Sequence, residues 1–193
     1  MRAWVGRRIT SERLCPYAGP GSEGGTAPKA VILMTVTVRA FEPATDRSWA
    51  SEVLDRDFGG AVQARRGEAL NALDMPGLVA EAGGRAVGLL FYRFDGDDCE
   101  LFAILATTRG EGVGTALVDA LVARAAGRRR IWVVTTNDNL RALRFYQRRG
   151  FSLCALRPGA VDDARRRLKP GIPLAGFDGI PLRDELELER RLD

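Results

Sequence analysis

The spacing of apolar residues changes near the middle of the chain, and this change limits the fold more than any other feature does. Before residue 107, apolar and polar positions alternate in short runs separated by turn signals such as Gly83-Gly84, which is typical of half-buried antiparallel strands. After residue 111 the spacing becomes helical over 112–126, and a continuous apolar run follows at Ile131–Thr136. This order predicts an α/β domain whose antiparallel first half passes into a strand–helix–strand unit.

The individual elements follow from the same patterns. Strands are predicted at Thr35–Phe41, Leu78–Ala82, Ala86–Phe94, Cys99–Ala106, Ile131–Thr136, Phe151–Leu156 and Glu185–Leu192. Helices are predicted at Asp46–Phe58, somewhere within Val62–Leu73, at Gly112–Ala126 and at Asn139–Arg149. Thr45 or Asp46 is the expected N-cap of the first helix, and Gly150 ends the last one.

The length of 193 residues suits a single domain. Residues 1–33 contain three prolines and a Gly-rich run without periodicity, so we predict a disordered N-terminal extension followed by one domain at 34–193. No apolar run approaches the roughly 20 residues of a membrane span, and the N-terminal segment lacks the apolar core of a secretory signal. We therefore expect a cytoplasmic protein that does not contact a membrane.

The net charge of +4 raises the question of a nucleic-acid partner. Residues 1–33 hold five basic and two acidic residues, which is +3, so the remaining chain carries only +1. Because the domain itself lacks the basic surplus that nucleic-acid binding requires, no nucleic-acid partner is expected.

Two absences restrict the chemistry. The chain has no His, which is the commonest general base and metal ligand, and Cys15, Cys99 and Cys154 are too far apart for a zinc motif. No metal site and no disulfide are predicted. Acid–base work is left to Asp, Glu, Tyr, Cys, Lys or water.

A Gly-rich segment, Arg109 to Thr115, lies between a predicted strand and a predicted helix. Glycines there let the backbone approach a ligand, and the helix N-terminus favours a pyrophosphate. The dinucleotide fingerprint G-x-G-x-x-G fails, because Thr115 stands where the third Gly should be, and no Gly-Lys pair supports a nucleoside-triphosphate loop. Arg109-x-x-Gly112-x-Gly114 is the pattern that remains.

The segment Asn139 to Phe151 resembles the N-x-x-A-x-x-F-Y-x-x-x-G-F signature of the GNAT superfamily of N-acetyltransferases. Arg109-x-x-Gly112-x-Gly114 is similar to the acetyl-CoA pyrophosphate loop of that family, and the resemblance covers about Cys99–Leu156. It implies a mixed sheet with an antiparallel first half, helices on both faces, and splayed central strands that hold acetyl-CoA.

The resemblance also implies roles for individual residues. The cofactor-binding set is Arg109, Gly110, Gly112, Val113, Gly114, Thr115, Asn139 and Ala142, together with the backbone of Ile104, Leu105 and Ala106. Tyr146 is expected to protonate the departing thiolate, the alternative being a core aromatic like Phe145. Glu100 is expected to accept the proton of the amine, the alternative being a solvated strand-end carboxylate. The chain departs from the family in having only Thr107-Thr108 before Arg109, where most members have a longer loop.

The segment from Arg157 to Asp184 is longer than a simple hairpin and resembles that of a bacterial GNAT subgroup without an assigned acceptor. Asp184, Glu185 and Glu100 are candidates for binding a cationic amine. Arg165–Arg167 are candidates for an acidic acceptor, or else form a solvated helix face. The expected function is acetyl transfer from acetyl-CoA to a primary amine. The alternative is a non-catalytic acyl-CoA-binding or regulatory module, and whether the chain forms a homodimer is left open.

Overall fold

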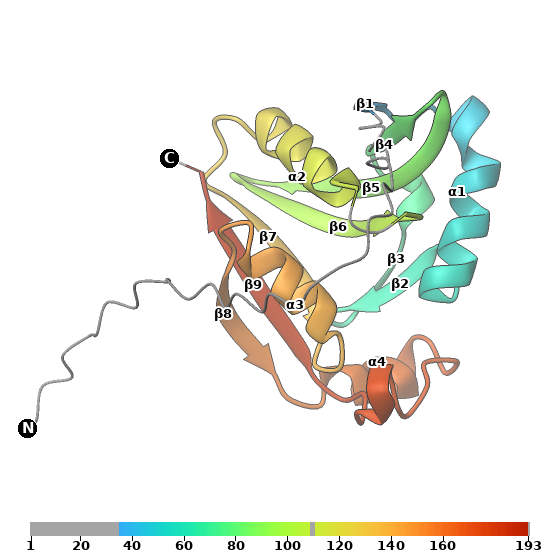
Figure 1. Cartoon of the computed structure of the whole chain (residues 1–193). Coiled ribbons are helices and arrows are strands. Elements are labelled where there is room, and N and C mark those ends of the chain that lie inside the picture. Colours follow the sequence, from blue (N-terminus) through green and yellow to red (C-terminus); the bar gives the residue numbers. More distant parts are fainter. Residues whose placement is uncertain (1–34, 109–110, 193) are drawn as a thin grey trace, which may run out of the picture. The chain divides into compact units, whose positions relative to one another are not determined.

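The computed structural model describes residues 35–108 and 111–192, which form one mixed sheet with helices packed against it (Figure 1). The predicted N-terminal extension lies outside the described residues. The sheet order is β1-β4-β5-β6-β7-β9-β8, and every neighbouring pair is antiparallel except β6 and β7. The predicted fold class, a mixed sheet with an antiparallel first half, is confirmed.

The bounds of the elements agree with most of the sequence predictions. The strands of the sheet are β1 (Val36–Ala40), β4 (Gly77–Ala82), β5 (Arg85–Asp95), β6 (Asp98–Ala106), β7 (Arg130–Thr136), β8 (Ser152–Arg157) and β9 (Glu185–Arg191). The helices are α1 (Pro43–Phe58), α2 (Val113–Arg124), α3 (Leu140–Gln147) and α4 (Ala160–Arg167), with short 3₁₀ turns at Ala72–Asp74 and Phe177–Gly179.

Alternation along the strands gives each face of the sheet its own core. On β4, Leu78 and Ala80 pack with Leu117 and Leu121 of α2. The intervening Val79 packs on the opposite face, in the cluster that includes residues of α1. Successive strand residues point to opposite faces, so the two apolar faces are covered by different helices, as predicted.

The first helix begins earlier than predicted. Pro43 is its first residue and Glu42 its N-cap, because proline suits the first helical turn, where an N–H would have no partner. Asp46, a predicted N-cap, instead lies buried within the first turns. Its carboxylate accepts the backbone N–H of Glu42 at 2.8 Å and pairs with Arg39 at 2.6 Å. The N-cap prediction was therefore wrong.

The helix predicted within Val62–Leu73 is also wrong, because this segment is a hairpin. Strands β2 (Val62–Arg65) and β3 (Glu68–Asn71) form a separate two-stranded sheet, joined by Arg66 and Gly67. Both turn residues have positive φ, 49° and 79°, as a two-residue turn of the primed type requires. Asn-Gly or Asp-Gly is the usual signal, and an Arg at the first position conceals the turn.

The two parallel strands at the centre of the sheet separate along their length. β6 and β7 pair only from Asp98↔Arg130 to Glu100↔Trp132, and no further pair joins them in the described structure. Opposite β5, the register shifts so that Phe102 is an extra residue, a β-bulge that bends β6. The predicted splayed strands are thus present, with the opening beyond Trp132.

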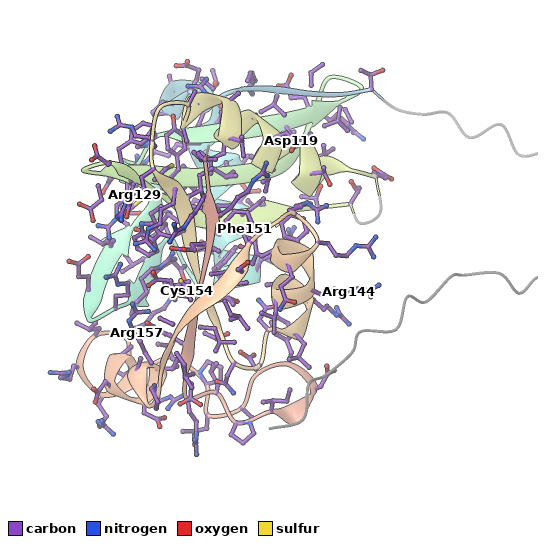
Figure 2. The ribbon with its side chains drawn as sticks, turned by 90° about the vertical axis from the view of Figure 1, so that its left-hand side faces the viewer. Asp119, Arg129, Arg144, Phe151, Cys154 and Arg157 are labelled. Atoms are coloured by element: carbon purple, nitrogen blue, oxygen red, sulfur yellow. The ribbon has the colours of Figure 1, made fainter. Side chains whose placement is uncertain are left out.

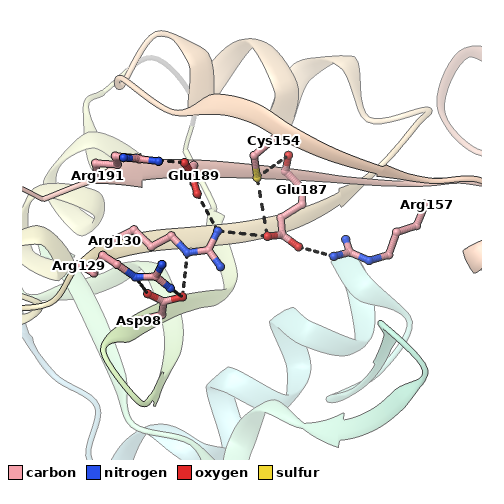
Figure 3. Close-up of polar contacts among 8 residues, drawn as sticks. All are labelled: Asp98, Arg129, Arg130, Cys154, Arg157, Glu187, Glu189 and Arg191. Atoms are coloured by element: carbon pink, nitrogen blue, oxygen red, sulfur yellow. Dashed lines mark hydrogen bonds and ion pairs between the residues drawn. The ribbon is translucent and has the colours of Figure 1, made fainter.

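An ion-pair network holds the same strands together at their closed end (Figure 3). Arg130 bonds to Asp98 of β6 at 2.8 Å and to Glu189 of β9 at 2.7 Å. Nearer the open end, Arg157 of β8 extends the network by reaching Glu187 of β9 at 2.6 Å. Burial alone would raise the pKa of Asp98, but hydrogen bonds from the arginines lower that pKa below its ordinary value. The network therefore fixes the closed end from which the strands diverge.

Cys99 and Cys154 are both free thiols. Cys99 is buried in the core, and burial raises the pKa of its thiol to about 12. Cys154 lies with Arg157 on the edge strand β8 (Figure 2).

In the part of the chain that the structure describes, no helix is both long enough and apolar enough to cross a membrane.

Candidate active site

A cavity of about 960 Å³ opens where β6 and β7 diverge. Its walls come from the ends of β6 and β7, the starts of α2 and β9, helix α3, the β2 strand of the hairpin, the end of α1, and the insert between β8 and β9. Of the predicted site residues, the cavity lining includes Ile104, Leu105, Ala106, Gly114, Asn139, Ala142 and Tyr146. Arg109 and Gly110 lie outside the described residues.

The edge of β6 presents backbone groups to this opening. The N–H of Thr107 donates to Val87 of β5, so alternation directs the backbone of Leu105 toward β5 as well. The N–H groups of Ile104 and Ala106 therefore face the gap, where β7 has diverged. Two neighbouring N–H groups in a confined space are suited to hold a carbonyl oxygen or an amide. Leu105, expected to contribute through its backbone, lines the cavity but directs its backbone to β5.

Helix α3 begins at the open end of β7. Asn139 is its N-cap, and its side-chain oxygen accepts the N–H of Ala142 at 3.0 Å. This cap explains why an Asn occupies the position irrespective of any ligand. The next turns direct Ala142, Phe145 and Tyr146 to the cavity.

Tyr146 lines the cavity and is buried, with 5% of its surface exposed. Its ring packs at tilted angles against Phe145 and Phe151, with centroids 5.3 and 5.6 Å away. Burial raises the pKa of the phenol well above its ordinary range, opposed in part by the charge of Arg65. At neutral pH the hydroxyl is therefore protonated and can donate a hydrogen bond.

The described residues of the Gly-rich segment form the start of α2. Gly112 is the N-cap with φ 79°, a left-handed conformation that favours glycine. Gly114 allows α2 to approach α3, since a Cβ there would lie 2.8 Å from the Phe145 ring. Val113 is buried in the core, and the Thr115 hydroxyl accepts a hydrogen bond from Arg149. The side chains of Val113 and Thr115 thus stabilise the described part of the segment, and the backbone N–H groups at the start of α2 are available to a ligand.

Glu100 does not line the cavity. Its carboxylate is fully buried and forms ion pairs with Arg93 and Arg65, so the solvated alternative is wrong. A carboxylate held by two guanidinium groups and shielded from the cavity has little access to an amine. The burial of Glu100 between two arginines could not be predicted from the sequence, because Arg65 lies in the segment that was predicted to be a helix and is a hairpin.

Arg65 and Glu185 also line the cavity. They lie far apart in the sequence, and only the fold brings them to the same site. Arg65 is 8% exposed, its guanidinium lies 3.7 Å from the centroid of the Phe102 ring, and it donates to the Phe102 carbonyl. Burial lowers the pKa of Arg65, while Glu100, Tyr146 and Glu185 act in the opposite direction. Glu185, at the start of β9, is 2% exposed and was expected only as an amine-binding candidate.

The insert between β8 and β9 supplies apolar side chains to the cavity: Val161, Ile172, Pro173, Phe177 and Leu182. Arg165 organises it by donating to the carbonyls of Ile172, Pro173 and Leu182 at 2.7–2.8 Å. Arg166 and Arg167 are exposed and pair with Asp163. None of the three arginines lines the cavity, so the expectation that they bind an acidic acceptor finds no support here.

The remaining candidates have structural roles. Asp184 accepts the N–H of Gly159 at 2.8 Å, at the start of α4, and does not line the cavity.

Among residues 35–108 and 111–192, no three His, Cys, Asp or Glu side chains come together in a metal-binding arrangement.

Comparison with known proteins gives one family. A model of the acetyltransferase (GNAT) family matches residues 39–151. The uncharacterized protein YdhI of Bacillus subtilis (strain 168) is 41% identical over 112 residues, which is 57% of this chain and 69% of that protein.

Solved structures show the same fold. The IAA acetyltransferase from Bacillus cereus ATCC 14579 matches with a TM-score of 0.62 at 18% identity, over 82% of this chain and 100% of the other. A GNAT family acetyltransferase from Elizabethkingia anophelis, solved with acetyl-CoA bound, matches with a TM-score of 0.61 at 16% identity, over 81% and 98%. At these identities the likeness is one of fold.

Proposed function

Since the chain belongs to the acetyltransferase (GNAT) family, whose members transfer acetyl groups from acetyl-CoA, we propose that it is an N-acetyltransferase acting on a primary amine. The match over residues 39–151 confirms the resemblance that the two sequence motifs indicated. The acetyl donor is acetyl-CoA, and the reaction of this family needs no metal.

The observation that carries the proposal is the combination of groups in one cavity. Two strand-edge N–H groups, those of Ile104 and Ala106, face the same opening that Tyr146 lines. Donors aimed at a carbonyl oxygen stabilise the negative charge that forms there when a nucleophile attacks. A protonated phenol nearby can donate to the sulfur as it leaves.

The cavity also suits the shape of the donor. Ala142 is small, which leaves room for an extended chain to pass along α3 toward the open end of the strands. The start of α2, with Gly112 and Gly114, offers helix N-terminal N–H groups for a pyrophosphate. Arg109 and Gly110 belong to the same proposed contact. Glu100 has no place in this scheme, because its carboxylate is enclosed by arginines.

The test is a screen for amine-dependent release of free CoA thiol from acetyl-CoA. The panel comprises polyamines, amino acids, aminoglycosides, peptides with free N-termini and aminoacyl-tRNA, with products identified by mass spectrometry. We expect thiol release that depends on one class of amine and an amide product heavier by one acetyl group.

A second measurement distinguishes the proposed enzyme from a non-catalytic acyl-CoA-binding module. If calorimetry shows acetyl-CoA binding but no amine in the panel raises thiol release above the rate of spontaneous hydrolysis, the protein is a non-catalytic acyl-CoA-binding module. An ester or thioester product would contradict the proposed N-specificity while leaving acetyl transfer in place.

A further inference from the structure

Three carboxylates line the cavity in the described part of the chain: Asp57, Asp138 and Glu185. Asp57 pairs with Arg56 at 2.8 Å, and more than a third of its side chain is exposed. Asp138 accepts hydrogen bonds from the Thr136 hydroxyl and from the backbone N–H of Phe177, the latter at 2.9 Å. Asp138 thereby anchors the insert.

Glu185 differs from both. It is 2% exposed, lines the cavity, and forms no ion pair with a side chain among residues 35–108 and 111–192. Its hydrogen bonds come from the backbone N–H of Arg66, which lies 3.1 Å from Oε1 and 3.2 Å from Oε2. Both oxygens share one donor, so the carboxylate keeps capacity to accept more hydrogen bonds.

The hairpin turn is built to hold that donor in place. Arg66 has a φ of 49°, an uncommon conformation for a residue with a long side chain. Its guanidinium lies over the Trp132 ring, 4.6 Å from the centroid, which anchors the turn to β7. Because this backbone conformation is disfavoured for Arg, the contacts around Arg66 must maintain it.

The charges around Glu185 come from several elements. Arg65 of β2, Arg66 of the turn and Arg157 of β8 act on it, and Arg65 also acts on Tyr146 of α3. Burial raises the pKa of the Glu185 carboxyl above its ordinary value, and the Arg66 N–H and the three arginines lower it by less. The carboxylate is therefore a stronger base than an exposed Glu.

We propose that Glu185 binds the acceptor ammonium at the inner wall of the cavity and takes its proton before the amine attacks. This inference rests on the proposed N-acetyltransferase function. Apolar side chains of the insert, including Ile172, Phe177 and Leu182, share the cavity with this carboxylate, which has no ion-pair partner in the described part of the chain. The acceptor that this arrangement suits is a primary amine with an apolar body.

The proposed reaction needs no reactant besides the amine and acetyl-CoA. The ammonium gives one proton to the Glu185 carboxylate and becomes a neutral amine. Its lone pair forms the C–N bond, and the C–S bond breaks with its electron pair remaining on sulfur. The thiolate takes the Tyr146 proton, the surplus proton on nitrogen restores the phenol through water, and Glu185 releases its proton to solvent.

The experiment uses the full chain with acetyl-CoA and three amine probes: 2-phenylethylamine, 1,4-diaminobutane and an alanine-starting tripeptide. The pH dependence of kcat/KM for the best probe is compared in wild type, Glu185→Gln and Glu185→Asp, and acetyl-CoA affinity is measured by calorimetry. Glu187→Gln is the matched control, because Glu187 is a buried carboxylate on the same strand that does not line the cavity.

Glu185→Gln is expected to lower kcat/KM for the amine by about 10²–10⁴-fold, the usual contribution of a positioned base. Its pH profile should lose the acidic limb, Glu185→Asp should recover part of the rate, and acetyl-CoA affinity should match wild type. A Glu185→Gln profile with the wild-type shape and rate, in an active wild type, overturns this inference alone. A wild type that binds acetyl-CoA but acetylates no probe, and no amine of the wider panel, overturns the proposed function as well.

Discussion

The backbone N–H of Arg66 donates to both carboxylate oxygens of Glu185, although 119 residues separate the two in the chain. The contact ties the tip of the β2–β3 hairpin to the first residue of β9, beside the open end of β7. It fixes the orientation of a buried carboxylate in the cavity without neutralising its charge. A carboxylate in that situation affects stability as well as reactivity.

Glu185→Gln is expected to raise the melting temperature at neutral pH. Burial raises the pKa of Glu185 in the folded state, so the folded protein binds its proton more tightly than the unfolded chain does. The free energy of unfolding therefore falls as pH rises from the unfolded value, about 4.3 for Glu, through the folded value. Above that window the wild type carries the full destabilisation and the Gln variant does not. Thermal denaturation across pH measures the difference, which should vanish in acid.

The control for this prediction is Glu187→Gln. Glu187 pairs with Arg157 and Arg130, so its neutralisation removes favourable contacts and should lower the melting temperature. If Glu185→Gln were also less stable than wild type at neutral pH, the carboxylate of Glu185 would be stabilising and the argument from burial would be wrong.

Arg165→Met is expected to raise KM for the amine while leaving acetyl-CoA affinity near its wild-type value. The side chain is 13% exposed and donates to three carbonyls that shape the insert. Hydrogen bonds to charged groups contribute about 1.5–3 kcal/mol each, so the insert wall should loosen and amine KM should rise by roughly tenfold or more. Arg166→Met is the control, since Arg166 is exposed and its ion pair among the described residues is with Asp163 on the same helix. Equal effects of the two variants would show that Arg165 does not organise the acceptor side.

Most of the strand and helix positions could be predicted from the sequence, because they depend on local alternation and spacing. Gly83-Gly84 gives the β4–β5 hairpin directly, and the continuous run at Ile131–Thr136 gives β7. The β2–β3 hairpin could not be predicted, because Arg66 adopts a positive φ that its residue type disfavours. Tertiary contacts to Trp132 and Glu185 hold it there.

In the candidate site, too, some residues could be predicted from the sequence and others could not. The candidate residues on α3 and at the start of α2 could be placed from the motifs, because each motif maps onto one element. Glu100 could not be interpreted correctly, since burial between Arg65 and Arg93 depends on the hairpin and on pairing with β5. The orientation of Glu185 depends on the same hairpin. Long-range contacts of this kind leave no periodic trace in the sequence.

Gly114→Ala is expected to destabilise the fold, although Ala is a better helix former than Gly. The new Cβ would lie 2.8 and 3.0 Å from ring carbons of Phe145, and overpacking of this kind typically costs about 1–3 kcal/mol. In a Phe145→Leu background the same change should become neutral or stabilising, because the ring is absent. Denaturant unfolding of the four proteins in the cycle measures the coupling. An equal cost in both backgrounds would show that the α2–α3 contact does not require glycine.

Gly112→Val is expected to weaken acetyl-CoA binding by at least ~1.4 kcal/mol, a factor of ten. Gly112 has φ 79°, and no atom of residues 35–108 or 111–192 lies within 4 Å of its Cβ position, so the described part of the protein has room for the side chain. The loss should come from a displaced helix start and from a branched group where phosphates approach. Gly127→Val is the matched control, with φ 81° and equally open surroundings among the described residues, because Gly127 follows the C-terminal end of α2 and not its start. If calorimetry finds the same affinity for both variants, the α2 start does not bind the donor.

Tyr146→Phe is expected to lower kcat by roughly tenfold to a hundredfold with little change in acetyl-CoA affinity. Tyr146 lines the cavity, and the substitution keeps the ring that packs against Phe145 and Phe151 and removes only the hydroxyl. The effect should fall at the low end of general-acid contributions, because a thiolate is a good leaving group and water can replace the phenol. Tyr92→Phe controls for loss of a buried hydroxyl, since Tyr92 lies in the same core but not in the cavity lining. Burst kinetics must first show that chemistry limits turnover. A kcat equal to wild type under that condition would make Tyr146 a packing residue, and the sulfur would take its proton from solvent.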